Sequence, residues 1–293
     1  MIQYLYLGRM GYGDALRLQE ELVALRQQER IENTLLLLEH PPVLTLGRNA
    51  DRSNVLAPDE LLARRGVTLH KINRGGDVTY HGLGQLIGYP IFDLRSLRSP
   101  SGGRLGPVDF VRMMEEALIR LCGVYGVGAG RICGLTGVWC HPRWGSSADQ
   151  SCGAASKDQP GGERKIAAIG IHVSRGVTSH GFAMNLTTDL RDFLLINPCG
   201  ITDRPVTSLE REVSGAAQLP GLEACAHQAA RQFGLVFGEQ VLALESLDAL
   251  RALAGTAPPQ QPGASQMPAE DTPLQAPRDV ERLHGSKARP VNA

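Results

Sequence analysis

The sequence has no excess of either charge, because 30 lysine and arginine residues balance 30 aspartate and glutamate residues in a chain of 293. A formal net charge of zero gives no electrostatic reason to expect a nucleic-acid partner or an anionic membrane surface. The composition is otherwise that of a globular protein, with 42% hydrophobic and 20% charged residues. Partners must therefore be selected by local shape and chemistry.

Long apolar runs are also missing. The longest aliphatic run, Leu35 to Leu38, is far too short to cross a bilayer. Residues 1–6 contain neither a basic segment nor the start of a long apolar one, so they do not resemble a secretion signal. We therefore predict a cytoplasmic protein with no membrane association.

The six cysteines are not spaced like a metal site. Cys133, Cys140 and Cys152 form no C-x2-C pair and have no H-x3-5-H pattern nearby, so we predict no metal. Reduced thiols are the expectation in a chain without a secretion signal. Cys122 and Cys225 fall in helical patterns and Cys140 ends a strand-like segment, so these three are predicted to be structural.

Hydrophobic periodicity predicts strands and helices that mix without strict alternation. Helices are expected at about 13–29, 58–62 with Pro58 at the first position, and 107–125, and strands at 34–39, 43–46, 67–73 and 85–93. This mixture favours an α/β or α+β domain with flanking helices around a mixed β-sheet. We predict one catalytic domain over 1–254, a loop at 142–162 and a disordered tail at 255–293, which is rich in proline, glutamine and charge.

Residues 165–186 contain two extended runs that meet at Arg175-Gly176, as is typical of a β-hairpin with a two-residue turn. Pairing across this turn places small and polar residues opposite one another on one face, in the pairs Ala168 and Ala183, Gly170 and Gly181, and His172 and Ser179. A slender apolar ligand could approach the backbone along such a face, although a packed helix would use it equally well. The opposite face is predicted to be ordinary core, formed by Ile169, Ile171 and Phe182.

A second glycine-rich segment spans residues 74–86. It follows one predicted strand and precedes another, whereas a dinucleotide-binding loop opens a helix, so we reject a Rossmann site. The segment combines backbone freedom with polar side chains, in the order Arg74, Gly75, Gly76, Thr79, Tyr80, His81, Gly82 and Gly84. Loops of this kind commonly form the wall of a pocket.

Cys199 lies between Pro198 and Gly200 and is therefore predicted to be an accessible thiol on a turn. A nucleophilic cysteine must be a thiolate, and lowering its pKa from about 8.5 to about 7 requires roughly 2 kcal/mol. An ammonium about 4 Å away supplies roughly 4 kcal/mol at an effective dielectric constant near 20. Lys165, at the start of the hairpin, is the candidate.

Two other readings of these groups stay open. Lys165 could be a surface lysine at the start of a strand, and His81, His172 and His180 are alternative bases. Strand alternation places Lys165 on the face opposite Ala168, so it reaches the small-residue face if the strand begins or twists there.

Four ordered motifs resemble the lipoyl(octanoyl) transferase family, at residues 74–81, 165–170, 181–183 and 198–201. Further matching segments at 38–43, 45–48, 137–139 and 206–209 extend the resemblance over about 34–210. The resemblance implies an octanoyl-[acyl-carrier-protein]:protein N-octanoyltransferase with a fold related to lipoate and biotin protein ligases, and it implies no ATP, cofactor or metal. The implied donor is octanoyl-acyl carrier protein. The implied acceptors are lipoyl domains of 2-oxoacid dehydrogenase complexes or the glycine cleavage H protein.

The resemblance also implies roles for individual residues. Cys199 would carry the acyl thioester and Lys165 would lower the pKa of its thiol. The implied substrate-binding residues are Arg74, Gly75, Gly76, Asp77, Val78, Thr79, Tyr80, His81, Ala168, Ile169, Gly170, Gly181, Phe182 and Ala183. Two alternatives are an ATP-dependent lipoate ligase, which would not need Cys199, and a non-catalytic module that binds acyl or lipoyl carriers.

Overall fold

The computed structural model describes residues 1–99, 102–141, 144, 162–197, 204–213 and 219–255. Met1–Ala257 forms one compact unit by its internal contacts. Most of the predicted loop at 142–162 and of the predicted tail at 255–293 lies outside the described residues, and so does Cys199.

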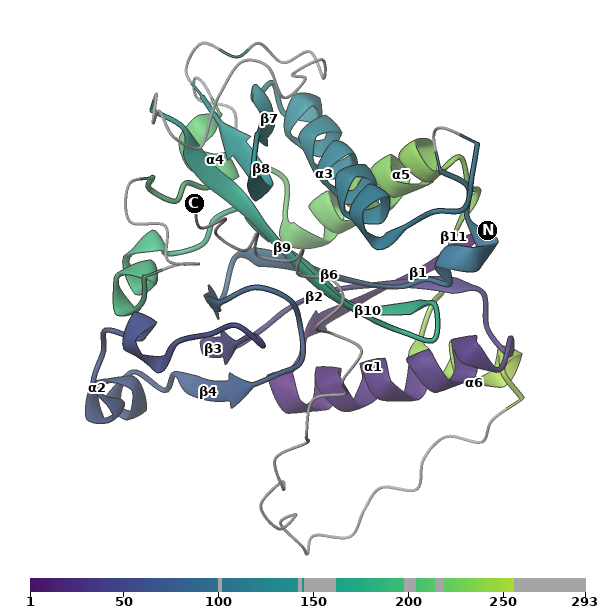
Figure 1. Ribbon diagram of the computed structural model, residues 1–293, viewed down its shortest axis with the longest axis horizontal. Helices are drawn as coiled ribbons and strands as arrows, with labels where there is room; N and C mark the ends of the chain where they lie inside the picture. Colours follow the sequence, from purple (N-terminus) through teal and green to yellow (C-terminus); the bar gives the residue numbers. More distant parts are fainter. Residues whose placement is uncertain (100–101, 142–143, 145–161, 198–203, 214–218, 256–293) are drawn as a thin grey trace, which may run out of the picture. The chain divides into compact units, whose positions relative to one another are not determined.

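An eight-stranded mixed sheet crosses the described unit in the order β11-β1-β2-β6-β10-β9-β8-β7 (Figure 1). Its strands are β1 (Ile2–Arg9), β2 (Asn33–Glu39), β6 (Gln85–Ile91), β7 (Ala129–Ile132), β8 (Leu135–Cys140), β9 (Arg164–Ser174), β10 (Val177–Asn185) and β11 (Val241–Ala243). β1 runs parallel to β2 and β11, and the other pairs are antiparallel. The predicted mixed sheet is confirmed.

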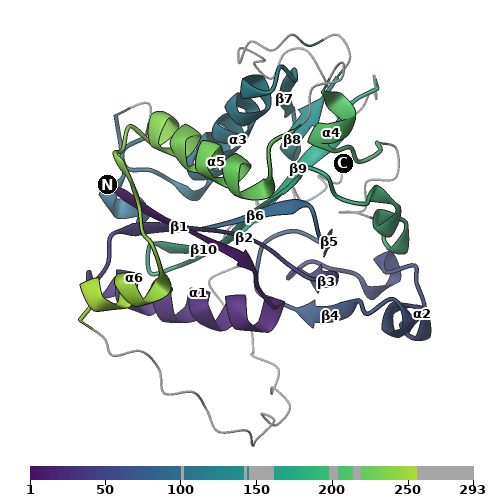
Figure 2. The same cartoon turned by 180° about the vertical axis from the view of Figure 1, so that it is seen from behind.

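Helices cover both faces of this sheet (Figures 1 and 2). α1 (Tyr12–Gln27) and α6 (Leu247–Leu253) pack on one face, and α3 (Pro107–Val124) and α5 (Leu222–Phe237) pack on the other. The run Leu35 to Leu38 alternates between the two resulting cores, and all four side chains are fully buried. A strand buried on both faces is hydrophobic at every position, which explains the run.

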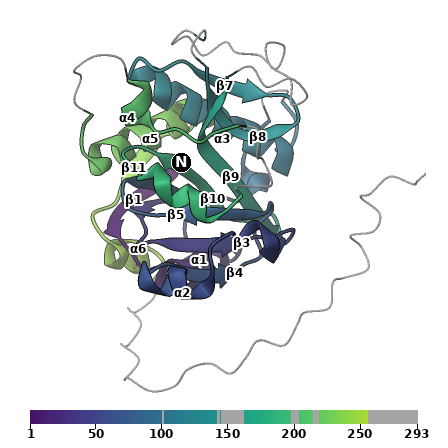
Figure 3. The ribbon, with the colours of Figure 1, turned by 90° about the vertical axis from the view of Figure 1, so that its left-hand side faces the viewer.

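A smaller sheet lies beside the large one, in the order β4-β3-β5 (Figure 3). Its elements are β3 (Val43–Leu46), α2 (Asp59–Arg64), β4 (Thr68–Lys71) and β5 (Val78–His81). β5 was not expected as a strand, and it forms because it pairs antiparallel with β3. The helix expected at 58–62 begins one residue later than predicted, since Pro58 has an extended ψ of 152° and occupies the N-cap.

The β9–β10 hairpin has the predicted register, with Ala168 opposite Ala183 and Gly170 opposite Gly181. Its turn residues Arg175 and Gly176 have positive φ angles of 48° and 86°. Positive φ at both central positions is the signature of a type I′ turn, whose twist matches that of the flanking strands. The glycine at the second position therefore serves the turn.

Gly181 has a packing role in addition to the one predicted, in which small residues leave room for a ligand. A Cβ atom there would lie 2.1 Å from the carbonyl oxygen of Gly88 and 2.5 Å from Cδ of Pro90. These atoms belong to β6, the neighbouring strand. The small residue therefore allows β6 and β10 to approach closely.

We expect Gly181→Ala to lower the free energy of unfolding by about 1–3 kcal/mol, because the added methyl group overpacks two strand backbones. Gly103→Ala is the matched control, since a Cβ atom at Gly103 meets nothing within 4 Å. Thermal unfolding followed by circular dichroism measures both. Equal losses in Tm for the two variants would contradict the close-approach explanation.

Candidate functional site

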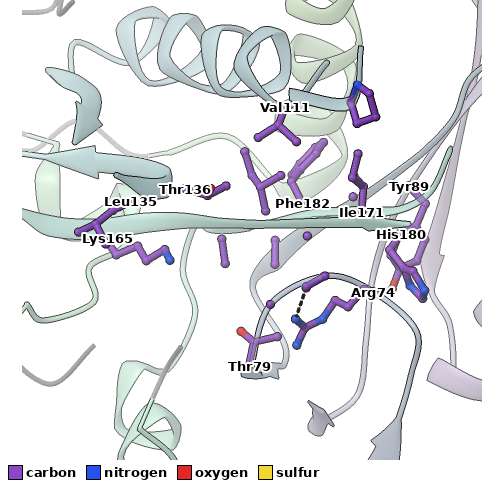
Figure 4. Close-up of a pocket in the computed structure, with 18 of the residues that line it drawn as sticks. Arg74, Thr79, Tyr89, Val111, Leu135, Thr136, Lys165, Ile171, His180 and Phe182 are labelled. Atoms are coloured by element: carbon purple, nitrogen blue, oxygen red, sulfur yellow. Dashed lines mark hydrogen bonds between the residues drawn. The ribbon is translucent and has the colours of Figure 1, made fainter. Parts of the chain in front are cut away.

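A cavity of about 510 Å³ lies against the β9–β10 hairpin (Figure 4). Most residues of the predicted site line it, namely Arg74, Gly75, Gly76, Thr79, His81, Lys165, Ala168, Ile169, Gly170, Gly181, Phe182 and Ala183. Segments that are distant in sequence are thus brought to one cavity, whose volume is in the usual range for a small-molecule site.

Asp77, Val78 and Tyr80 are not among the residues that line the cavity. Thr79 and His81 of β5 face it, so strand alternation directs Val78 and Tyr80 to the other side. There both side chains join the core beneath the small sheet, and the hydroxyl of Tyr80 donates to Asp192 at 2.7 Å. A contribution of these residues to binding stays a prediction.

The cavity extends to both faces of β9. Ala168 and Gly170 lie on one face of the strand and Ile169 and Ile171 on the other, yet all four line the cavity. In Figure 4, Val111 and Phe182 lie on one side of the hairpin and Thr79 and Arg74 on the other. The expectation of core at the second face is confirmed for Phe182, whereas Ile169 and Ile171 pack against the core but are only half-buried.

The free edge of β9 explains this shape. Pairing with β8 covers Arg164 to Ala167, and beyond Ala167 the described residues add no further strand along that edge. The cavity passes from one face of the sheet to the other around this edge. We refer to its two parts as the β5 side, which includes Thr79, and the α3 side, which includes Val111.

Lys165 is buried, with 8% of its surface exposed, and it lines the cavity. Its Nζ lies 5.2 Å from the ring centroid of Trp139. A Cβ atom at Gly137 would lie 2.8 Å from Cε of Lys165, so this glycine leaves room for the lysine side chain. Within the described part of the chain the ammonium has neither a hydrogen bond nor an ion pair.

A register shift brings Lys165 to the same cavity as Ala168. The pairing of β8 with β9 shifts between Val138 and Trp139, which disturbs the strict alternation of faces along β9. Lys165 and Ala168 also share a second, small pocket with Thr79. Lys165 therefore reaches the side of β9 on which Ala168 lies, as expected for a strand that begins or twists at this position.

A buried polar chain connects the cavity wall to the segment that follows residue 203. Nδ1 of His81 bonds to Gln85 at 2.8 Å, Gln85 donates to Asn185 at 2.9 Å, and Asn185 donates to the carbonyl oxygen of Thr207 at 2.9 Å. The Gln85 amide also donates to a backbone carbonyl oxygen, so its Oε1 accepts from His81 Nδ1–H. The backbone N–H of Thr207 donates to the carbonyl oxygen of Lys165 at 2.8 Å.

The histidines of the cavity are neutral and weakly basic. Burial, with a smaller contribution from the Arg74 guanidinium, lowers the pKa of His81 to about 3 and that of His180 to about 4. Bases of this kind take up a proton poorly at neutral pH. His172, the third candidate base, is not among the residues that line the cavity. Of the predicted proton-transfer groups that line the cavity, Lys165 is thus the one that remains, and its role stays a prediction.

The three cysteines predicted to be structural are buried and free, which confirms that prediction. Burial raises the pKa of the Cys122 thiol to about 12 and also raises the pKa of Cys140 and Cys225. Such thiols are poor nucleophiles. Across the described residues no cluster of histidine, cysteine and carboxylate side chains is arranged to hold a metal ion, and no helix is long and apolar enough to cross a membrane.

Residues 11–233 match the family described as Lipoyl protein ligase A/B catalytic domain. The chain belongs to this family. It is 60% identical over 247 residues to the octanoyltransferase of Acidobacterium capsulatum, covering 84% of this chain and 94% of that one. It is 48% identical to the octanoyltransferase of Koribacter versatilis over 97% of both chains. The prediction that this member of the lipoyl protein ligase A/B family is an acyltransferase is confirmed.

Solved structures of lipoate-protein ligases share the fold. Lipoate-protein ligase A bound with ATP aligns with a TM-score of 0.60 at 16% identity, over 87% of this chain and 93% of that one. A bipartite lipoate protein ligase from Thermoplasma acidophilum aligns with a TM-score of 0.59 at 16% identity, over 87% and 91%. The predicted relation in fold is confirmed for the lipoyl protein ligase A/B domain.

Sequence reasoning missed several residues that line the cavity of this lipoyl protein ligase A/B domain. They are Tyr12, Tyr89, Val108, Val111, Leu135 and Thr136. Val111 lies within a helix that was correctly predicted, but its apolar side chain gives the same signal as a core residue. Trp139 was noted as part of a motif, and its place under the ammonium of Lys165 depends on the pairing of β8 with β9.

Proposed function

We propose that the chain transfers an octanoyl group from acyl carrier protein to a lysine of a lipoyl domain, through a thioester on Cys199. The acceptor domains belong to 2-oxoacid dehydrogenase complexes or to the glycine cleavage H protein. The observation that carries the proposal is the buried ammonium of Lys165, which lies unpaired among the described residues at a largely apolar cavity. The identity to octanoyltransferases supports the same chemistry.

The residues on either side of 198–203 support a role for Cys199 near Lys165. The backbone N–H of Asn197 donates to the carbonyl oxygen of Asn54 at 2.8 Å, and Cys199 follows two residues later in the sequence. On the other side, the backbone N–H of Lys165 donates to the carbonyl oxygen of Pro205 at 2.9 Å.

In the first half-reaction the Cys199 thiolate attacks the carbonyl carbon of the octanoyl thioester. A bond forms between that carbon and Sγ, the carbon–sulfur bond of the donor breaks, and the departing carrier thiolate takes a proton from the Lys165 ammonium. Backbone N–H groups at Cys199 and Gly200 are candidates to stabilise the oxyanion.

In the second half-reaction the acceptor amine attacks the acyl-enzyme. The new carbon–nitrogen bond is an amide, the bond to Sγ breaks, and the neutral Lys165 amine takes the proton that the attacking nitrogen releases. The enzyme returns to a thiolate and an ammonium, so no net proton is gained or lost by the pair. Ping-pong kinetics are expected.

Intact-mass measurement after incubation with octanoyl-acyl carrier protein, without ATP, tests the proposal. We expect one octanoyl adduct on the wild-type chain and its loss in Cys199→Ser. An adduct that persists in that variant as readily as in the wild type would refute the acyl-enzyme. A requirement for ATP would favour a lipoate ligase, and binding of the carrier without an adduct would favour a non-catalytic module.

The indole under Lys165 yields a separate prediction. We expect Trp139→Met to slow acylation about 2-fold to 30-fold more than Trp139→Phe, because phenylalanine keeps an aromatic face for the ammonium and methionine does not. Both variants remove a similar volume from a fully buried site. Single-turnover acylation rates are compared at matched folded fractions, measured by circular dichroism. Equal rates in the two variants would leave Trp139 as packing alone.

A further inference from the structure

The free edge of β9 presents unpaired peptide groups to the cavity. The carbonyl oxygen of Ile171 points outward at this edge and accepts from the backbone N–H of Gly75 at 3.0 Å. Alternate residues of a strand direct their N–H and C=O groups to the same edge, so those of Ile169 also point outward. Pairing of β9 with β8 ends at Ala167, so in the described part of the chain no strand pairs with Ile169 on that side.

An unpaired peptide unit in a cavity wall is unusual. Backbone polar groups away from bulk water are nearly always hydrogen-bonded, and a strand edge readily accepts a further extended chain. Ile169 is half-buried and lines the cavity. The site therefore offers one donor and one acceptor to an extended ligand that carries amide groups.

The α3 side of the cavity adds an apolar wall and a positive charge. Val108, Val111 and Leu135 line it together with Arg112. Arg112 belongs to an ion-pair network of three arginines and two glutamates, formed by Arg112, Arg120, Arg131, Glu115 and Glu116, and so carries one net positive charge. An anionic group is attracted to the rim at Arg112.

We propose that the α3 side and the free edge of β9 bind the pantetheine arm of the acyl donor, an inference that rests on the proposed function. Amide groups of the arm pair with the N–H and C=O of Ile169, its methylene groups pack on Val111 and Leu135, and its phosphate lies near Arg112. The acyl chain then takes the β5 side, along Ala168 and Thr79. The thioester between them lies where the cavity turns around the strand.

The chemistry of the arm distinguishes it from the other substrate. The stem of an acceptor lysine consists of methylene groups and offers no amide to Ile169 before the folded domain that carries it. The pantetheine arm is slender, contains two amides and ends in a phosphate. It matches the unpaired peptide groups, the apolar wall and the net charge of the Arg112 network at once.

Two small thioesters test the proposal on the full chain, S-octanoylpantetheine and the amide-free S-octanoyl-2-mercaptoethanol. We expect kcat/KM for acylation of the wild type to be at least about tenfold higher with the pantetheine thioester, as one or two added hydrogen bonds allow. In Val111→Trp, which narrows the α3 side, this ratio should fall towards one. The control Val124→Trp adds the same side chain to the exposed far end of α3 and should keep the ratio.

The outcomes separate the inference from the proposed function. Equal kcat/KM values for the two thioesters in the wild type would overturn the pantetheine site while leaving octanoyl transfer intact, and this comparison needs no variant. A ratio of the two kcat/KM values that stays unchanged in Val111→Trp would also overturn the pantetheine site. If the loss of rate in Val111→Trp depended on the length of the acyl chain, the α3 side would be assigned to the acyl chain instead. Failure of octanoyl-acyl carrier protein to acylate the wild type would refute the proposed function itself.

Discussion

Replacing Lys165 with alanine should slow octanoyl transfer about 10²-fold to 10⁴-fold at neutral pH, the range typical for loss of a positioned proton-transfer group. The ammonium is buried, unpaired among the described residues and held over Trp139, so its charge is available to a nearby thiolate. The cavity histidines cannot replace it, because the pKa values of His81 and His180 are about 3 and about 4.

The rate of alkylation of Cys199 as a function of pH isolates the electrostatic part of this effect. We expect the profile to move to higher pH in Lys165→Ala. Lys165→Arg keeps a charge but cannot release a proton, so it should retain much of the alkylation profile and lose acyl transfer. Lys71→Ala removes an exposed lysine and serves as the control. Unchanged acyl transfer in Lys165→Ala would exclude it from the reaction.

The second large effect is a loss of stability in mild acid. Burial lowers the pKa of His40 to about 4, of His81 to about 3 and of His180 to about 4, from the ordinary value of 6.5. Between pH 6.5 and the lowered pKa values of the folded protein, the unfolded chain binds protons that the folded chain does not. The free energy of unfolding therefore falls as pH falls. The contribution is complete above pH 6.5 and is lost progressively towards pH 4.

The size of the effect follows from the proton linkage. Each histidine lowers the free energy of unfolding by about 2 kcal/mol at pH 5 relative to neutral pH. The three together lower it by roughly 5 kcal/mol, which is less than the sum because His40 and His81 influence one another. Urea unfolding at a series of pH values measures the slope. His81→Gln should reduce the slope by about a third, whereas His227→Gln, at a half-exposed position, should leave it unchanged. A flat profile from pH 7 to pH 5 would contradict the burial of these rings.

Local sequence patterns predicted the parts of the site that depend on local geometry. The register of the hairpin follows from its two-residue turn with glycine, and it placed Ala168, Gly170, Gly181 and Ala183 correctly. Apolar periodicity found α1 and α3, because an amphipathic helix repeats its pattern over several turns.

Features that depend on where strands stop pairing could not be predicted from the sequence. β5 has four residues inside a glycine-rich segment and is a strand because β3 lies beside it. The side of β9 reached by Lys165 depends on a register shift near Trp139, and the two-sided cavity depends on the end of β8 pairing at Ala167. These are properties of the assembled sheet, and no local pattern encodes them.

The pairing of β1 with β11 has a consequence for synthesis on the ribosome. Ile2 pairs with Val241, so β1 receives its outer neighbour after nearly all of the described unit has been made. Until then one edge of β1 is open to wrong partners, and contacts between such distant residues form slowly. Release of the nascent chain before residue 241 should therefore give a species that aggregates, whereas chains that extend past residue 243 can close the sheet.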